Sequence, residues 1–164
     1  MNRILIFGNS GSGKTTMARF LAAERGLVHL ELDLLAWDSP GVRRPLVASV
    51  AEIEAFVTTN DSWVIEGGYG DLIDAVVPFC TELRFLNLGI DVCLAHCRLR
   101  PWEPEKYPSP AEQDAMLDFL MAWIRDYETR TDEFSLERHR RIFDGFEGAK
   151  REYAMVGDTD RGAI

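Results

Sequence analysis

The sequence predicts an α/β fold, in which short strands of a parallel sheet alternate with helices. Short apolar runs alternate along the chain with stretches whose apolar residues recur at helical spacing. A glycine-rich segment, residues 8–15, directly follows the first apolar run and opens the first helical stretch. No internal repeat, charge block or low-complexity tract interrupts this pattern. We therefore expect one layered domain.

The first half of the chain is expected to supply three strands and two helices. Strands are predicted at residues 3–7, 27–32 and 63–66. The first helix covers residues 14–25, because Gly26 stands where a left-handed C-terminal cap is wanted. After a loop rich in Pro, Gly and Arg, Ser49 and Glu52 form a capping box that opens a second helix ending near Asn60.

The second half is expected to be mainly helical. A strand at residues 83–88 is followed by Gly89 and by a helix that Asp91 caps and that stops before Pro101. Residues 101–110 form a loop, and Ser109, Pro110 and Glu112 together start a long helix. One apolar stripe along that helix predicts packing over its whole length. The stripe consists of Met116, Leu117, Leu120, Trp123, Ile124 and Tyr127.

The end of the chain is less strongly patterned. A last helix is expected at residues 135–146, and residues 150–156 are the only late candidate for a further strand. The sheet therefore has four or five strands. The predicted domain covers residues 1–156, with a lid-like helical segment at about 101–147, and residues 157–164 form a flexible tail.

Composition limits the kinds of partner. The chain has 164 residues, is 46% hydrophobic and carries a formal net charge of -9, enough for one core but unfavourable for nucleic acid. The first apolar run is too short for a signal peptide or a membrane span, so a cytoplasmic protein without a membrane partner is expected. The oligomeric state stays open.

The three cysteines are Cys80, Cys93 and Cys97. Their odd number and spacing indicate reduced thiols rather than a disulfide framework. Cys93, His96 and Cys97 lack a second ligand pair nearby, so buried thiols on a helix are a better interpretation than zinc.

The glycine-rich segment carries the most specific signal. It satisfies the pattern G-x-x-x-x-G-K-[ST] between a strand and a helix, the context of a phosphate-binding loop. The glycines let successive backbone N–H groups point at phosphate oxygens, helped by the helix N-terminus. Lys14 is aimed at the β- and γ-phosphates, Thr15 ligates Mg²⁺ and Thr16 donates to the α-phosphate. The predicted nucleotide-binding residues are Gly8, Asn9, Ser10, Gly11, Ser12, Gly13, Lys14, Thr15 and Thr16.

From Met1 to about Arg100 the chain resembles the nucleoside-monophosphate-kinase-like branch of the P-loop NTPases, which includes adenylate and shikimate kinases. Within that branch it looks most like small bacterial proteins labelled adenylate-kinase-like or topology modulation proteins. The shared patterns are His-Leu-x-Leu-Asp-x-Leu-x-Trp at residues 29–37 and Trp-Val-Ile-x-Gly-x-Tyr at residues 63–69. The resemblance implies a three-layer P-loop kinase fold with strand order 2-3-1-4-5 and an acceptor site across the carboxyl ends of the strands.

Physical reasoning places ligands of open parallel sheets at the same edge, where Asp33 and Glu66 are expected. Asp33 orients a Mg²⁺-bound water or accepts the proton of a substrate hydroxyl. The alternative is that it caps a helix or turn. Glu66 lies beside the acceptor or is a structural carboxylate bonded to loop amides. The substrate-side candidates are Asp33, Arg43, Glu66, Gly67, Gly68 and Tyr69.

Phosphoryl transfer also requires cations, and kinases of this shape carry arginines on a mobile lid. Arg98, Arg100, Arg125 and Arg130 are the candidates; Arg98 and Arg130 join Lys14 and Asp33 as predicted catalytic residues. Each of these arginines could equally be a solvated surface charge. Arg43 and Arg44 either hold an anionic acceptor or form a plain exposed pair.

Some family features are missing. Adenylate kinases have Asp-Gly-Phe-Pro-Arg after the third strand, where this chain has Glu66, Gly67, Gly68, Tyr69 and Gly70 without an arginine. Shikimate kinases carry two aspartates flanking one residue, which residues 31–33 match only in part. The acceptor is therefore open.

The leading hypothesis is a small-molecule kinase that uses Mg-ATP. The alternative is a nucleotide-dependent regulatory or interaction protein with slow or no ATP hydrolysis. A GTPase is disfavoured because no Asn-Lys-x-Asp guanine motif occurs, and direct DNA binding is disfavoured by the acidic balance. Trp37, Trp63, Trp102 and Trp123 lie on different elements, which favours core or pocket packing over base stacking.

Overall fold

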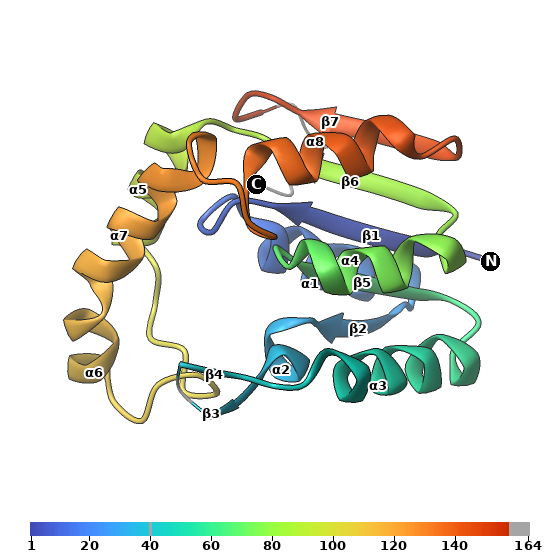
Figure 1. The fold of residues 1–164 in the computed structure, drawn as a ribbon, viewed down its shortest axis with the longest axis horizontal. Helices are drawn as coiled ribbons and strands as arrows, with labels where there is room; N and C mark the ends of the chain where they lie inside the picture. The colour runs from blue at the N-terminus through green and yellow to red at the C-terminus, as the bar shows by residue number, and fades with distance from the viewer. Residues whose placement is uncertain (40, 158–164) are drawn as a thin grey trace.

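A computed structural model describes residues 1–39 and 41–157, and its centre is a five-stranded parallel sheet (Figure 1). The order across the sheet is β2-β5-β1-β6-β7. Counting only these strands along the chain gives the order 2-3-1-4-5 that the resemblance implied. The weakly patterned candidate near residue 150 is the fifth strand. The strands are β1 (Arg3–Gly8), β2 (Val28–Glu31), β5 (Trp63–Gly67), β6 (Glu82–Leu86) and β7 (Ala149–Tyr153).

Helices surround the sheet and extend beyond its carboxyl edge. The α-helices are α1 (Lys14–Arg25), α2 (Asp33–Ala36), α3 (Leu46–Thr59), α4 (Gly70–Val76), α5 (Ile90–Arg98), α6 (Pro110–Ala115), α7 (Leu117–Arg125) and α8 (Leu136–Gly145). Two short 3-10 helices, η1 (Val77–Phe79) and η2 (Asp126–Glu128), follow α4 and α7.

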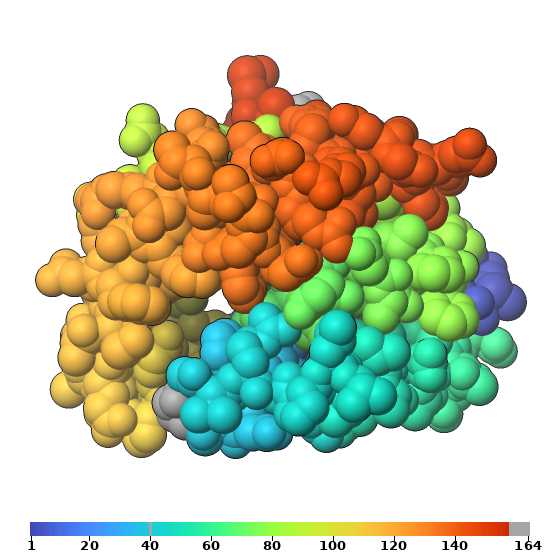
Figure 2. All heavy atoms as spheres, in the orientation of Figure 1, coloured from blue at the N-terminus to red at the C-terminus, as the bar shows by residue number. Residues whose placement is uncertain are grey.

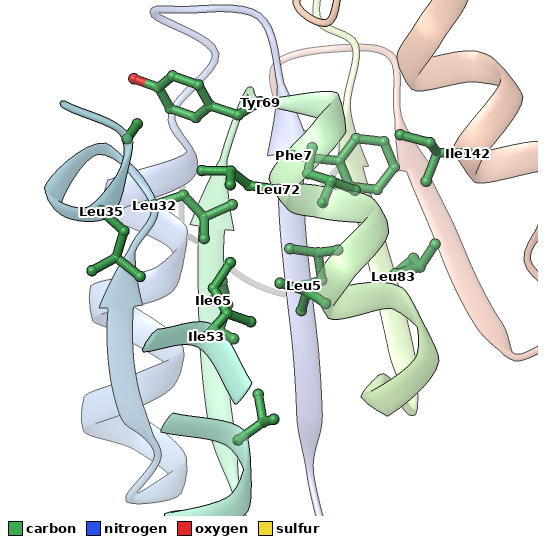
Figure 3. Packing of buried hydrophobic residues seen from close by; sticks show 14 of the residues in the cluster. Leu5, Phe7, Leu32, Leu35, Ile53, Ile65, Tyr69, Leu72, Leu83 and Ile142 are labelled. Atoms are coloured by element: carbon green, nitrogen blue, oxygen red, sulfur yellow. The ribbon is translucent and has the colours of Figure 1, made fainter. Parts of the chain in front are cut away.

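Two apolar layers sandwich the sheet, because successive side chains of each strand point to opposite faces. On one face, Leu5 and Phe7 pack with residues of α3, α4 and α8, such as Ile53, Leu72 and Ile142 (Figure 3). On the other face, a second cluster of strand residues packs against α1 and Tyr153. The result is the expected three-layer arrangement, with α6 and α7 at the carboxyl end of the strands (Figure 1).

Local capping signals placed several boundaries correctly. The helix α1 has the predicted bounds, and Gly26 adopts the left-handed conformation with φ of 64°. The side chains of Ser109 and Ser135 cap α6 and α8 by accepting hydrogen bonds from the amides of Glu112 and Arg138. These caps act within one turn of the chain, so the sequence alone was sufficient to find them.

Two predicted caps are wrong. The helix α3 begins at Leu46, and Ser49 lies buried inside it, where its hydroxyl donates to the carbonyl of Leu35 at 2.7 Å. Glu52 instead pairs with Arg44. Asp91 lies in the first turn of α5 without capping it, because Gly89 occupies the N-cap position. Contacts with other elements therefore took over side chains that suited a capping role.

The long helix predicted from residue 110 is broken at Met116 into α6 and α7. The two halves are held by different partners. The Gln113 side chain bonds the backbone of Pro101 and Glu103, which ties α6 to the preceding loop, whereas Ile124 of α7 packs on α5. Met116 is 43% exposed, so the stripe does not pack along its whole length as predicted.

The loop after α2 contains a small antiparallel hairpin of β3 (Trp37–Ser39) and β4 (Val42–Arg43). Cys80, Cys93 and Cys97 are free thiols, as expected. In the described part of the chain, no helix is long and apolar enough to cross a membrane. The predicted flexible tail lies, apart from Gly157, outside the described residues.

Candidate functional site

The glycine-rich loop turns tightly between β1 and α1, and its glycines are required sterically. Gly11 and Gly13 have φ of 75° and 93°, in the left-handed region that favours glycine. A Cβ atom on Gly8 would lie 2.3 Å from the carbonyl oxygen of Leu86, and one on Gly11 would lie 2.4 Å from that of Cys93. The loop is therefore packed directly onto the backbone of β6 and α5.

Polar groups inside the loop fit a phosphate chain. The hydroxyl of Ser12 is buried without a hydrogen-bond partner among the described residues, and burying such a group is costly unless it binds something. Lys14 Nζ donates to the carbonyl of Asn9 at 2.8 Å. The Asn9 amide donates to the carbonyl of Ile124 at 3.1 Å, which links the loop to α7. Backbone N–H groups at a helix N-terminus, the unpaired Ser12 hydroxyl and the Lys14 ammonium group are donors of the kinds that bind phosphate oxygens.

Thr15 and Glu66 join the loop to the neighbouring strand. The Thr15 hydroxyl donates to Glu66 Oε1 at 2.7 Å. Glu66 lies near the carboxyl end of β5, which pairs with β1, and it is only 4% exposed. A hydroxyl beside a carboxylate at the start of the loop helix is a suitable pair of oxygen ligands for Mg²⁺.

Asp33 lies at the carboxyl end of β2, as the sequence predicted, but it does not cap a helix. Leu32 occupies the N-cap position of α2, and no side chain caps that helix. The Asp33 carboxylate accepts a hydrogen bond from the Tyr69 hydroxyl and lies 3.3 Å from Lys106 Nζ. Tyr69 in turn accepts a hydrogen bond from Trp37 Nε1 at 2.8 Å. Asp33 is thus held by Tyr69 and Lys106, which come from two separate segments, and Trp37 in turn holds Tyr69.

Burial and neighbouring charges shift the pKa values of the site. Burial raises the pKa of Glu66 to about 7, although Lys14 and the hydrogen bond from Thr15 act in the opposite direction. Burial also lowers the pKa of Lys14, opposed by the charges of Glu66 and Asp33. Desolvation disfavours ionised Asp33, but Lys106 and Tyr69 outweigh it and lower the Asp33 pKa. Two carboxyls in one site therefore differ in proton affinity.

An aromatic cluster extends from Asp33 toward the lid-like segment. The Phe134 ring stacks edge-on with Tyr69 and Trp123, at 5.2 and 5.0 Å between ring centroids. The Arg43 guanidinium lies 5.0 Å from the Tyr69 ring, and that of Arg130 lies 3.4 Å from the Trp123 ring. Figure 2 shows the surface hollowed between the segment around α2 and β3 and the lid-like segment.

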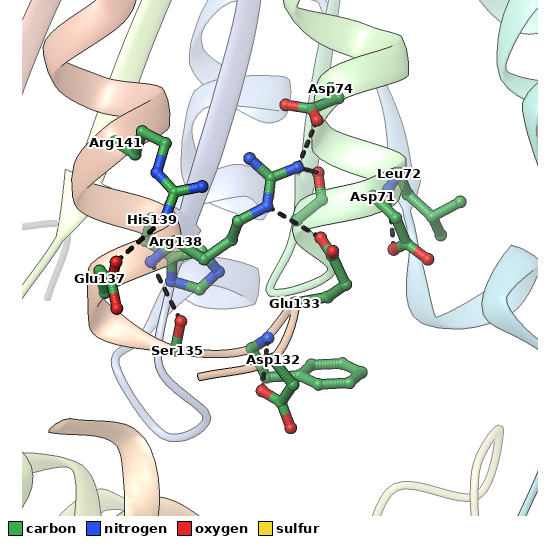
Figure 4. A network of polar contacts seen from close by, with 12 residues as sticks. Asp71, Leu72, Asp74, Asp132, Glu133, Ser135, Glu137, Arg138, His139 and Arg141 are labelled. Atoms are coloured by element: carbon green, nitrogen blue, oxygen red, sulfur yellow. Dashed lines mark hydrogen bonds and ion pairs between the residues drawn. The ribbon is translucent and has the colours of Figure 1, made fainter. Parts of the chain in front are cut away.

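The first half of α8 and the residues just before it hold the glycine turn after β5 in place. His139 is buried, and its two ring nitrogens contact the carbonyl of Gly68 at 3.0 Å and the hydroxyl of Tyr127 at 2.8 Å. Arg138 bonds Glu133 at 2.9 Å and also reaches Asp74, which joins this segment to α4 (Figure 4). Burial lowers the pKa of His139 to about 4. The imidazole is therefore neutral near pH 7, donating to Gly68 and accepting from Tyr127.

The predicted arginines do not converge on one point. Arg98 is exposed at the end of α5, and Arg125 is also exposed. Burial lowers the pKa of Lys14, and the charge of Arg100 contributes to the same shift. Arg130 pairs with Asp132 at 2.8 Å and faces the aromatic cluster instead.

Other substrate-side candidates have structural partners. Arg43 is paired with Asp71 at 2.9 Å rather than being plainly exposed. A Cβ on Gly67 would lie 2.7 Å from Leu32 Cβ, and one on Gly68 would lie 3.2 Å from the Gly8 carbonyl. These glycines therefore let parts of the protein itself approach closely.

Sequence reasoning missed two residues of the site. Lys106 contacts Asp33 at 3.3 Å and Glu31 at 3.5 Å, although it lies in a loop without helical or strand periodicity. His139 lies on the last helix, and no sequence pattern marked it as a residue of the site. An isolated lysine in a proline-rich loop of an acidic chain was the only available signal for Lys106, and no sequence pattern connected it with Asp33.

Solved structures share this fold. They include a shikimate kinase from Bacteroides thetaiotaomicron, with 17% identity, a TM-score of 0.57 and coverage of 98% of this chain and 89% of that chain. A shikimate kinase from Acinetobacter baumannii in complex with shikimate has 16% identity and a TM-score of 0.53, and the match covers 99% of this chain and 86% of that chain. A sugar kinase from Janibacter sp. has 16% identity and a TM-score of 0.54, and the match covers 94% of this chain and 85% of that chain. No family model and no curated protein matches the chain. The chain thus has a P-loop kinase fold.

Proposed function

We propose that this protein binds Mg-ATP through residues 8–16 and transfers the γ-phosphoryl group to a hydroxyl of a small acceptor. The observation that carries the proposal is the hydrogen bond of 2.7 Å between Thr15 and Glu66, which joins the loop helix to the edge where Asp33 lies. Lys14 interacts electrostatically with both carboxylates. Donor-binding and acceptor-activating groups thereby share one site, as a kinase requires.

Each residue of this site has a role that its surroundings support. Lys14 and the loop amides bind and neutralise phosphate oxygens, and Arg100 adds positive charge on the same side. Asp33 is kept ionised by Lys106, so it can orient the acceptor hydroxyl and accept its proton. During transfer the acceptor oxygen bonds to the γ-phosphorus, and the bond from that phosphorus to the departing ADP oxygen breaks.

The oxygen donors of Thr15, Glu66 and Asp33 suit Mg²⁺, which prefers hard oxygen ligands. When bound, Mg²⁺ neutralises phosphate charge. The pKa of about 7 for Glu66 means that the cation competes with a proton at this carboxyl near neutral pH.

The acceptor is proposed to bind in the hollow between the segment around α2 and β3 and the lid-like segment (Figure 2). Tyr69, Phe134 and Trp123 offer apolar surfaces, and Arg43 and Arg130 lie over these rings. The neighbours described as shikimate and sugar kinases make polyhydroxylated rings and sugar acids the first compounds to test. The three free thiols support placing the protein in a reducing compartment such as the cytoplasm.

A coupled assay of ADP release tests the proposal over panels of polyhydroxylated acids, sugars and nucleoside monophosphates. We expect Lys14→Ala to abolish the acceptor-dependent rate, while Arg25→Ala, at the far end of the same helix, retains it. Turnover that survives Lys14→Ala would contradict the assignment of the loop. Tight ATP binding without acceptor-dependent ADP release would favour the alternative of a nucleotide-dependent regulatory protein.

A further inference from the structure

The side chains of His29, Glu31 and Glu66 lie together on the face of the sheet that α1 covers. One ligand atom from each residue lies within 4.8 Å of the others. His29 and Glu31 alternate along β2 with Leu30, which packs on the opposite face. The parallel register places Glu31 directly beside Glu66 of β5. The cluster is therefore fixed by two adjacent strands of the sheet rather than by flexible loops.

Charge makes this cluster unusual. Two carboxylates directly opposite one another on neighbouring strands repel and destabilise the sheet unless cations compensate them. Glu31 is compensated by Arg19 at 3.2 Å and Lys106 at 3.5 Å, which contact different oxygens of its carboxylate. Glu66 retains a raised pKa of about 7, to which the charge of Glu31 contributes. The cluster would be stabilised by a further positive charge.

The side chain of His29 indicates which kind of cation would bind at this cluster. Its Nε2 atom is buried and has no hydrogen-bond partner among the described residues. Burial lowers the pKa of His29, which keeps the imidazole neutral and able to donate an electron pair. An imidazole nitrogen beside two carboxylates is a ligand set for a transition metal rather than for Mg²⁺.

We propose that His29, Glu31 and Glu66 form a binding site for a divalent transition-metal ion such as Zn²⁺, in addition to the Mg²⁺ of the proposed kinase reaction. Ligand atoms on one tetrahedral ion with bonds of about 2.1 Å lie about 3.4 Å apart, so the three side chains must turn inward by up to about 1.4 Å. Each Glu31 oxygen already contacts a cation. The metal therefore either displaces Arg19 or Lys106 or binds a carboxylate oxygen that also contacts one of them.

Binding of Co²⁺, a spectroscopic substitute for Zn²⁺, tests the site on the full chain without nucleotide and with excess Mg²⁺. We expect visible ligand-field bands that Zn²⁺ abolishes and Mg²⁺ leaves unchanged. His29→Gln and Glu31→Gln should each weaken Co²⁺ binding at least about tenfold, the scale on which even outer partners of a metal act. Glu54→Gln, which removes the same charge from an exposed position of α3, should leave the affinity unchanged.

Several results would overturn the proposal. They are absence of Co²⁺ binding to the wild-type protein, unchanged affinity in a folded His29→Gln variant, and a sulfur-to-cobalt charge-transfer band that assigns the metal to the cysteines. If His29→Gln does not fold, nuclear magnetic resonance of the wild-type protein decides. Paramagnetic Co²⁺ must then affect the His29 ring signals more strongly than those of His96 and His139. Equal effects on all three rings would refute the site. Because the assay omits ATP, its outcome is independent of kinase activity.

Discussion

Lys106 Nζ lies 3.3 Å from Asp33 Oδ2, although the two residues are far apart in the chain. Lys106 comes from the loop between α5 and α6, and it also contacts Glu103 at 3.2 Å. The contact connects the lid-like segment with the carboxylate that is proposed to activate the acceptor. The charge that this loop brings to Asp33 therefore contributes to lowering the pKa of that carboxyl.

Replacing Lys106 with methionine should move the acid limb of the pH profile of kcat/KM to higher pH. Lys106 lowers the Asp33 pKa, so its removal raises that pKa and protonates the proposed base at higher pH. The profile is measured with the acceptor found in the coupled assay. Lys106→Arg keeps the charge and serves as the control. An acid limb at the same pH in Lys106→Met would show that Asp33 does not limit the rate.

Glu66→Gln should flatten the pH dependence of stability. The folded carboxyl has a pKa of about 7 against 4.5 for an unperturbed one, so the wild-type free energy of unfolding falls as pH rises across this interval. The variant should gain up to about 3 kcal/mol relative to wild type above pH 7, at about 1.4 kcal/mol for each unit of pKa. Urea unfolding between pH 5 and about 8 measures the difference.

Glu152→Gln provides a control in which the expected change in stability at neutral pH has the opposite sign. Hydrogen bonding to Arg140 lowers the Glu152 pKa, so that ionised carboxylate stabilises the fold at neutral pH and the contribution is lost on acidification. This variant should lose stability at neutral pH. If both variants gave the same pH dependence, the raised pKa of Glu66 would be refuted.

Gly11→Ala should be more damaging than Gly41→Ala, although the two glycines have nearly equal φ, 75° and 77°. An added Cβ meets the Cys93 carbonyl at 2.4 Å in the first case and, among the residues that the structure describes, nothing within 4 Å in the second. Gly41→Ala should cost about 1 kcal/mol for the left-handed backbone alone. Gly11→Ala should cost more and also weaken ATP binding, as measured by unfolding and by calorimetric titration. Equal stability losses would mean that the loop can move away from α5.

Tyr127→Phe should destabilise the protein by about 1–3 kcal/mol, because it leaves a buried nitrogen of His139 without its hydrogen-bond donor. Tyr107→Phe is the matched control, since the Tyr107 hydroxyl has no hydrogen-bond partner in the part of the chain that the structure describes. Unfolding in urea compares the two. A loss for Tyr127→Phe no larger than for Tyr107→Phe would contradict the bonding pattern assigned to His139.

The sequence was most informative where structure depends on neighbours in the chain. The caps of α1, α6 and α8 lie within a turn of the residues they serve, and the loop pattern depends on the backbone freedom of its own glycines. It was least informative where a side chain finds a distant partner. Ser49 had the right spacing for a capping box, but it bonds Leu35 instead. Lys106 meets Asp33 only after the sheet and its loops are assembled.

In the candidate site too, the positions of residues along the strands could be predicted, whereas their contacts with distant residues could not. The positions of Asp33 and Glu66 at the carboxyl ends of β2 and β5 followed from strand prediction and parallel topology. Their contacts did not, because Tyr69, Thr15 and Lys106 reach them across different elements. The break of the long helix at Met116 could not be predicted either, because the two halves of one apolar stripe pack against different parts of the protein.

The edge strand β7 pairs with β6 in parallel, with Leu86 beside Tyr153, and it comes from the last described part of the chain. During synthesis β7 is made after the other four strands of the sheet, so a nascent chain presents β6 as an unpaired edge from the time β6 is made until β7 follows. Unpaired edges recruit other strands and promote aggregation. Truncation before Ala149 would make that transient state permanent, and the yield of such shortened chains should depend on chaperones.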